Sequence, residues 1–74
     1  MNTRDRALAI MKPFLGPAAQ DMLDRTARTM LGLESDELQL VHVDSLAYWV
    51  RAGAAKLMSE ARADELAAEL RRID

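Results

Sequence analysis

Apolar residues in the stretch from Val43 to Ser59 recur at the spacing of an α-helix. Successive members of the series lie four, three and four positions apart, which places them on one face of a helical wheel. They are Leu46, Val50, Gly53 and Leu57, with Trp49 and Ala54 beside them. The stretch also holds the only Trp and the only Tyr of the chain. We therefore expect a central helix around which the other elements are arranged.

The length of the chain, 74 residues, is that of one domain spanning residues 1–74. A core this small leaves a free energy of unfolding of only ~3–5 kcal/mol. The chain has no Cys and one His, which argues against disulfides and zinc sites, and we expect no metal and no cofactor. Self-association or docking on a partner is the natural supplement to so small a core.

The composition is that of a soluble globular protein, with 50% apolar and 30% charged residues and a formal net charge of -2. The acidic balance argues against a nucleic acid as the main partner. No apolar run is long enough to span a bilayer, and the charged start of the chain lacks the apolar core of a secretory signal. We expect a cytoplasmic protein with no membrane partner.

Capping residues and prolines predict two helices before the central one. Asn2 or Thr3 caps the first, and Pro13 should end or kink it near Met11 or Lys12. The second is expected over residues 17–31, with Gly16 as its N-cap and Gly32 closing it in the left-handed conformation. One face of this second helix is predicted to be buried, namely Ala19, Met22, Leu23, Thr26 and Met30.

The segment from Glu34 to His42 is less regular. Residues 35–38 indicate one capped helical turn, and a short strand over residues 40–43 is an alternative without an obvious pairing partner. Four apolar residues are expected to hold this segment on the core, namely Leu38, Leu40, Val41 and Val43. Asp44 is the predicted N-cap of the central helix, and Ser59 that of the last helix. The last helix should bury Ala63, Leu66, Ala67, Leu70 and Ile73.

These elements predict an all-α fold, a small four-helix bundle-like domain with a short irregular segment between helices two and three. The central helix carries a second apolar face, where Tyr48, Ala52 and Ala55 lie opposite the buried stripe. In so short a chain such a face favours contact with another chain, although Tyr48 could instead staple the helix start. The candidate partner-binding residues are Tyr48, Trp49, Arg51, Ala52, Ala55 and Lys56, the aromatic pair as anchors and the cations at the rim.

No catalytic constellation is apparent, so we expect no enzyme. His42 fits a base or a pH-sensitive contact, but also an ordinary loop histidine. The triplet Asp44-Ser45-Leu46 is the one in which acyl-carrier proteins modify the serine, but no Gly precedes it and the helix that follows carries Arg51 and Lys56. A helix-turn-helix DNA-binding regulator is the other alternative, its phosphate contacts being Arg25, Arg28, Arg51 and Lys56.

The run PFLGPAAQDMLDRTARTMLGL, followed by SLAYWV and ADELAAEL, resembles small all-helical accessory domains at the ends of bacterial signalling proteins. Such domains often follow receiver or kinase domains. The resemblance implies a regulatory protein-interaction role and carries over no catalytic residue. Our prediction is a non-catalytic regulatory, adaptor or oligomerisation module that binds a protein partner, or a second copy in a homodimer, through the central helix.

Overall fold

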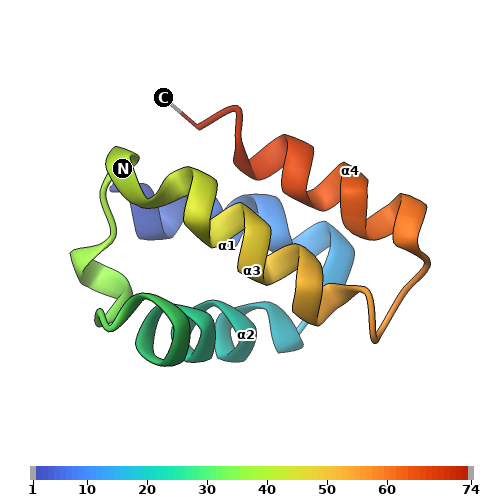
Figure 1. Cartoon of the computed structure of the whole chain (residues 1–74), viewed down its shortest axis with the longest axis horizontal. Coiled ribbons are helices and arrows are strands. Elements are labelled where there is room, and N and C mark those ends of the chain that lie inside the picture. The colour runs from blue at the N-terminus through green and yellow to red at the C-terminus, as the bar shows by residue number, and fades with distance from the viewer. Residues whose placement is uncertain (1, 74) are drawn as a thin grey trace.

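Four α-helices joined by short turns make up residues 2–73, the part of the chain that the computed structural model describes (Figure 1). The helices are α1 (Thr3–Leu15), α2 (Ala18–Thr26), α3 (Val43–Ala54) and α4 (Glu60–Leu70). A π-helical turn, η1 (Ala27–Leu31), continues α2, and two 3₁₀ turns, η2 (Ser35–Glu37) and η3 (Leu40–His42), lead into α3. These residues form no strand, so the predicted all-α fold with an irregular segment between helices two and three is confirmed.

Consecutive helices run in alternating directions, and each packs against two others (Figure 1). α3 lies against α2 and α4, and α1 lies against the same two helices. The first and last helices also meet through side chains, since the Arg62 guanidinium lies 4.3 Å from the centre of the Phe14 ring. The arrangement encloses one core shared by all four helices.

The core is built from small and medium-sized side chains. Seven of its sixteen buried apolar residues are Ala, which lets the helices approach closely, and none is aromatic. The largest fully buried side chains are Met11, Leu23, Leu46, Val50, Leu66 and Leu70. Since no aromatic residue fills the interior, the chain's Trp and Tyr lie at its surface.

α1 runs past the proline that was predicted to end or kink it. Its N-cap is Asn2, as expected, whose Oδ1 accepts a bond from the Asp5 amide at 2.8 Å. Pro13 lies inside the helix. The backbone amide of Gly16, the residue that follows the helix, donates to the Lys12 carbonyl at 2.8 Å. Only two residues of α1 follow the proline, so a single missing hydrogen bond near the end does not stop the helix.

The second helix ends in a wider turn than the sequence indicated. Gly32 closes it in the left-handed conformation with φ +69°, as predicted, but its amide donates to the Ala27 carbonyl, five residues back. Each residue of a π-turn rotates the chain about the helix axis by a smaller angle than a residue of an α-helix does. Met30 is therefore turned outward and is 52% exposed, and its predicted burial is wrong. At the start of α2 the N-cap is Pro17, so Gly16 is not the cap.

α3 begins and ends earlier than predicted. It starts at Val43 because η3 runs directly into it, so the N-cap is His42, and Asp44 lies in the first turn without a capping bond. It ends at Ala54, since the Leu57 amide donates to the Ala54 carbonyl at 2.8 Å in a tighter turn. Leu57 is therefore 65% exposed, and its predicted burial is wrong.

Of the four apolar residues predicted to hold the segment before α3 on the core, only two are buried. Leu38 and Val43 are buried, whereas Leu40 and Val41 are exposed on the turn η3, which replaces the possible strand. α4 has the predicted cap and buried residues, although it ends at Leu70 and Ile73 lies in the turn that follows it. Ser59 Oγ accepts a bond from the Arg62 amide at 3.2 Å, and all five residues expected on its inner face are buried.

Candidate interaction surface

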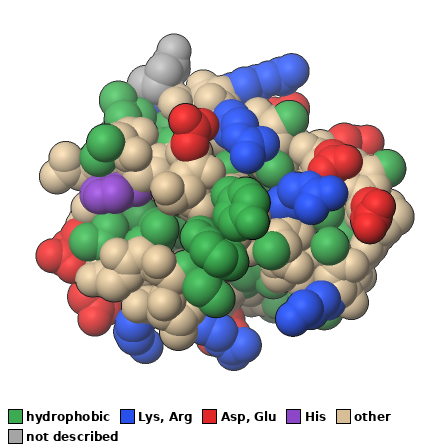
Figure 2. All heavy atoms as spheres, in the orientation of Figure 1, with side chains coloured by type: hydrophobic (Ala, Val, Ile, Leu, Met, Phe, Trp, Pro, Cys, Tyr) green, Lys and Arg blue, Asp and Glu red, His purple; other side chains and the backbone are tan. Residues whose placement is uncertain are grey.

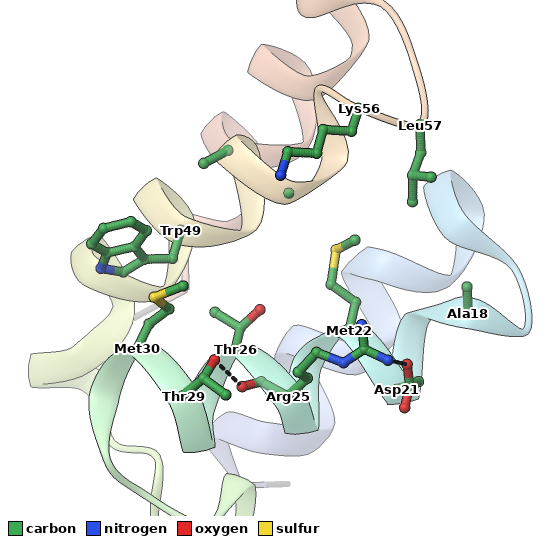
Figure 3. A pocket seen from close by; sticks show the side chains of 12 residues that line it. Ala18, Asp21, Met22, Arg25, Thr26, Thr29, Met30, Trp49, Lys56 and Leu57 are labelled. Carbon is green, nitrogen blue, oxygen red and sulfur yellow. Dashed lines mark hydrogen bonds and ion pairs between the residues drawn. The ribbon is translucent and has the colours of Figure 1, made fainter.

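A groove of about 530 Å³ runs between α2 and α3 (Figure 3). Its apolar walls hold Met22 and Met30 from the second helix, Trp49 from α3 and Leu57 from the turn that follows α3. Trp49 and Met30 lie at one end of the groove, and Leu57 and Ala18 at the other (Figure 3). The remaining lining residues are Asp21, Arg25, Thr26, Thr29, Ala52, Gly53 and Lys56.

The groove exists because α3 presents very small residues to α2. Gly53 has no side chain, and a Cβ placed there would lie 3.6 Å from Cε of Met22, which covers the floor (Figure 3). Ala52 beside it adds only a methyl group. These small residues leave the space beside Met22 open. The π-turn and the tight turn after Ala54 then place Met30 and Leu57 in the walls.

Exposed apolar side chains gather around α3. All six large apolar residues that are well exposed in residues 2–73 lie on α3, on the turns at its two ends, or on η1. They are Met30, Leu40, Val41, Tyr48, Trp49 and Leu57. Hydrophobic side chains accordingly cluster over the middle of α3 in Figure 2, with Lys and Arg side chains below them over α2. The well-exposed large apolar side chains of residues 2–73 are thus grouped around α3.

Tyr48 and Trp49 form an aromatic pair at the edge of the groove. Their ring centroids are 4.9 Å apart and the rings meet edge to face at 88°. Tyr48 is 57% exposed and Trp49 37% exposed, so the two rings contact each other while much of their surface stays open to solvent. Rigid, half-exposed aromatic rings are the side chains that most often dominate binding energy at protein interfaces.

The charges at the groove are unbalanced. Asp21 and Arg25 form an ion pair at 2.8 Å on the α2 side, and the Arg25 carbonyl also accepts a bond from the Thr29 hydroxyl at 2.7 Å. On the α3 side, Lys56 has no ion-pair partner within residues 2–73. The groove therefore carries one uncompensated positive charge, in a chain whose net charge is -2.

Three of the six predicted partner-binding residues line the groove, namely Trp49, Ala52 and Lys56, and Tyr48 lies beside it. The other two lie toward α4. Arg51 donates to Asp64 of α4, and this hydrogen bond raises the pKa of the Arg51 guanidinium above its ordinary value. Ala55 is half-buried against the core. The wall contributed by α2 was not predicted, and Gly53 inside a helix was its one local signal.

The residues behind the alternative functions are placed as follows. Ser45 is exposed in the first turn of α3. Of the four cations considered as phosphate contacts, Arg25, Arg28 and Arg51 each pair with a carboxylate, those of Asp21, Glu34 and Asp64. Such pairing reduces the positive potential that nucleic-acid binding depends on. His42 Nδ1 accepts a bond from the Gln39 amide at 3.0 Å, which is a local loop contact.

Residues 2–73 bring together no group of three or more His, Cys, Asp or Glu side chains able to hold a metal ion. None of the helices in this range combines the length and apolar character needed to cross a membrane. Comparison with known protein families, with curated proteins and with solved structures gives no match. The resemblance to accessory domains of bacterial signalling proteins thus stays a prediction.

Proposed function

We propose that this chain is a non-catalytic protein-interaction module, of regulatory or adaptor type, that binds a partner protein through the outer face of α3 and the groove beside α2. The observation that supports the proposal is the grouping of all six well-exposed large apolar side chains around α3. Apolar surface gathered in one place and rimmed by charges is typical of interaction sites.

The small core supports the same proposal. A chain of 74 residues with an Ala-rich interior has a small free energy of unfolding, and a partner that binds only the folded state raises it by mass action. Covering Tyr48 and Trp49 removes aromatic surface from water in the complex at no cost to the core.

The test is site-specific photo-crosslinking in the cells that make the protein. A photoreactive phenylalanine analogue replaces Leu57 at the groove or, as the matched control, Ala68 on the exposed face of α4. We expect a discrete crosslinked protein from position 57 and none from position 68. Equal crosslinking from both positions, or none from position 57, would contradict the proposal.

Sedimentation of the purified chain separates the two kinds of partner. A dimer that Ala52→Glu dissociates without unfolding would identify a second copy as the partner, because the new carboxylate lies in the middle of the exposed face of α3. A monomer at high concentration would assign the surface to a different protein. Circular dichroism of the Ala52→Glu variant serves as the folding control.

A further inference from the structure

We propose that the groove between α2 and α3 binds an amphipathic helix of a partner protein, two to three turns long, which places apolar side chains in the groove and a carboxylate against Lys56. The inference rests on the proposed function and specifies the segment that the partner must contribute. It is drawn from the length, the walls and the charge of the groove.

The length of the groove matches a short helix. Its lining runs from Ala18 to Met30 along the second helix and from Trp49 to Leu57 along the α3 side. At the rise of an α-helix these spans are about 18 and 12 Å. Two to three turns of a bound helix are about 11 to 16 Å long, close to these spans, and side chains at positions i and i+7, about 10 Å apart, would point toward the two apolar ends.

The walls favour a helix over an extended segment. An extended peptide gains backbone hydrogen bonds from its partner where a strand edge receives it, and residues 2–73 contain no strand. A helix satisfies its own backbone and needs only side-chain contacts. Met22 and Met30 supply flexible, polarizable walls, which adapt to the shape of the inserted side chains.

The unpaired positive charge in the groove favours a negative charge on the bound helix. The Asp21–Arg25 pair is internally balanced, so Lys56 is the one lining charge left for a partner among residues 2–73. A carboxylate on the bound helix would neutralise it. In a symmetric dimer through α3, Lys56 would instead face a copy of the same surface, whose groove carboxylate, Asp21, is already paired with Arg25.

The chain carries its own reporter for the test. Trp49 is the only Trp and lines the groove, so its fluorescence emission changes when a peptide without Trp or Tyr covers it. The probe is a displayed library of helical peptides about 12 residues long. Its apolar positions vary among Leu, Met and Phe, and its flanking positions vary among Asp, Glu, Gln, Lys and Arg.

We expect the peptides selected by the full chain to carry Asp or Glu at one flanking position and to shift the Trp49 emission. The Lys56→Glu variant should weaken a selected peptide about three- to tenfold and should turn the selection toward Lys or Arg. Lys12→Glu is the matched control, because it makes the same charge change at an exposed residue of α1 away from the groove, and it should leave both results unchanged.

Several outcomes would overturn the inference. They are an absence of enrichment, selected peptides with no preference for acidic residues, peptides that leave the Trp49 emission unchanged, or a dimer of the free chain that Leu57→Glu dissociates. If the library fails while crosslinking from position 57 captures a discrete protein, the helical occupant is wrong and the proposed function stands. If both fail, the proposed function fails with it.

Discussion

At the scale of single residues, replacement by alanine should have opposite effects on the free energy of unfolding at Gly32 and at Gly53. Gly32 has φ +69° with open space around it, so an added side chain there meets only backbone strain. We expect Gly32→Ala to lower the free energy of unfolding by about 1–2 kcal/mol. Gly53 lies within α3, where an added Cβ makes ordinary contact with Met22 at 3.6 Å. Gly53→Ala should raise the free energy by about 0.5–1 kcal/mol. Urea unfolding of both variants checks the opposite signs.

Leu46 and Leu57 fall on the same helical stripe in the sequence, yet only one of them belongs to the core. Leu46 is fully buried, whereas Leu57 is 65% exposed on the turn after α3. We expect Leu46→Ala to cost about 2–5 kcal/mol and Leu57→Ala less than about 0.5 kcal/mol. Comparable losses in thermal or urea unfolding would mean that the helix continues through residue 57, as the periodicity alone indicates.

How well a residue's burial is predictable depends on its distance from a helix end. The inner face of α4 follows the ideal helical period, and the four predicted residues that lie within this helix, Ala63, Leu66, Ala67 and Leu70, are all buried. Met30 and Leu57 lie where the helix widens into a π-turn or tightens into a 3₁₀-type turn, and the angle per residue changes there. A wheel drawn at one fixed angle therefore puts both on the wrong face.

At the scale of elements, Arg4 ties the start of α1 to α2 and to the turn η2. Its Nε donates to Ser35 Oγ at 2.8 Å, and its guanidinium lies 3.6 Å from Oδ1 of Asp24, a buried atom with no hydrogen bond. Arg4→Met removes the only cation within ion-pair distance of that carboxylate in the described residues and frees the turn. We expect a loss of about 1–3 kcal/mol.

Hydrogen exchange provides the measurement for Arg4. The amides of Glu37 and Leu38, which bond within η2 and at its end, should lose protection in Arg4→Met more than the amides of α4 do. The double variant Arg4→Met with Asp24→Asn is the control, since it removes the uncompensated charge and should recover part of the loss. Uniform loss of protection would show that Arg4 acts on the whole fold.

The existence of the elements was predictable, but their boundaries depended on neighbours. Caps at Asn2 and Ser59 and the left-handed Gly32 were predictable because each acts within one turn of chain. Asp44 has the chemistry of a cap, yet η3 supplies a helical turn ahead of it, so its side chain is not needed there. Pro13 likewise removes one backbone hydrogen bond, which locally favours the end of a helix. The contacts of Phe14 and Leu15 with the core nevertheless keep the next two residues helical.

At the scale of the whole molecule, all four helices share one core, so unfolding should be a single cooperative transition. We expect circular dichroism at 222 nm, which follows all helices, and Trp49 emission, which follows the groove, to give the same urea midpoint. An earlier fluorescence transition would show instead that α3 and α2 separate before the rest of the bundle unfolds.

The groove is also a whole-molecule property, which explains why only three of its twelve lining residues were predicted. Ala52 was predicted from the second apolar face of α3, Trp49 as an aromatic anchor and Lys56 as a cation at the rim. The α2 wall depends on which helices are neighbours in the fold. No periodicity within one segment carries that information.

The alternation of the helix directions has a consequence for connectivity. α1 begins and α4 ends at the same end of the bundle, and these two helices pack against each other (Figure 1). A circularly permuted chain, with a flexible linker joining the old ends and new termini in the turn over residues 55–59, should therefore fold into the same bundle. Near-native helical dichroism and Trp emission would show it, and a molten or aggregated permutant would mean that the link between α3 and α4 is essential for folding. The interaction surface would then depend on how the helices pack and not on their order along the chain.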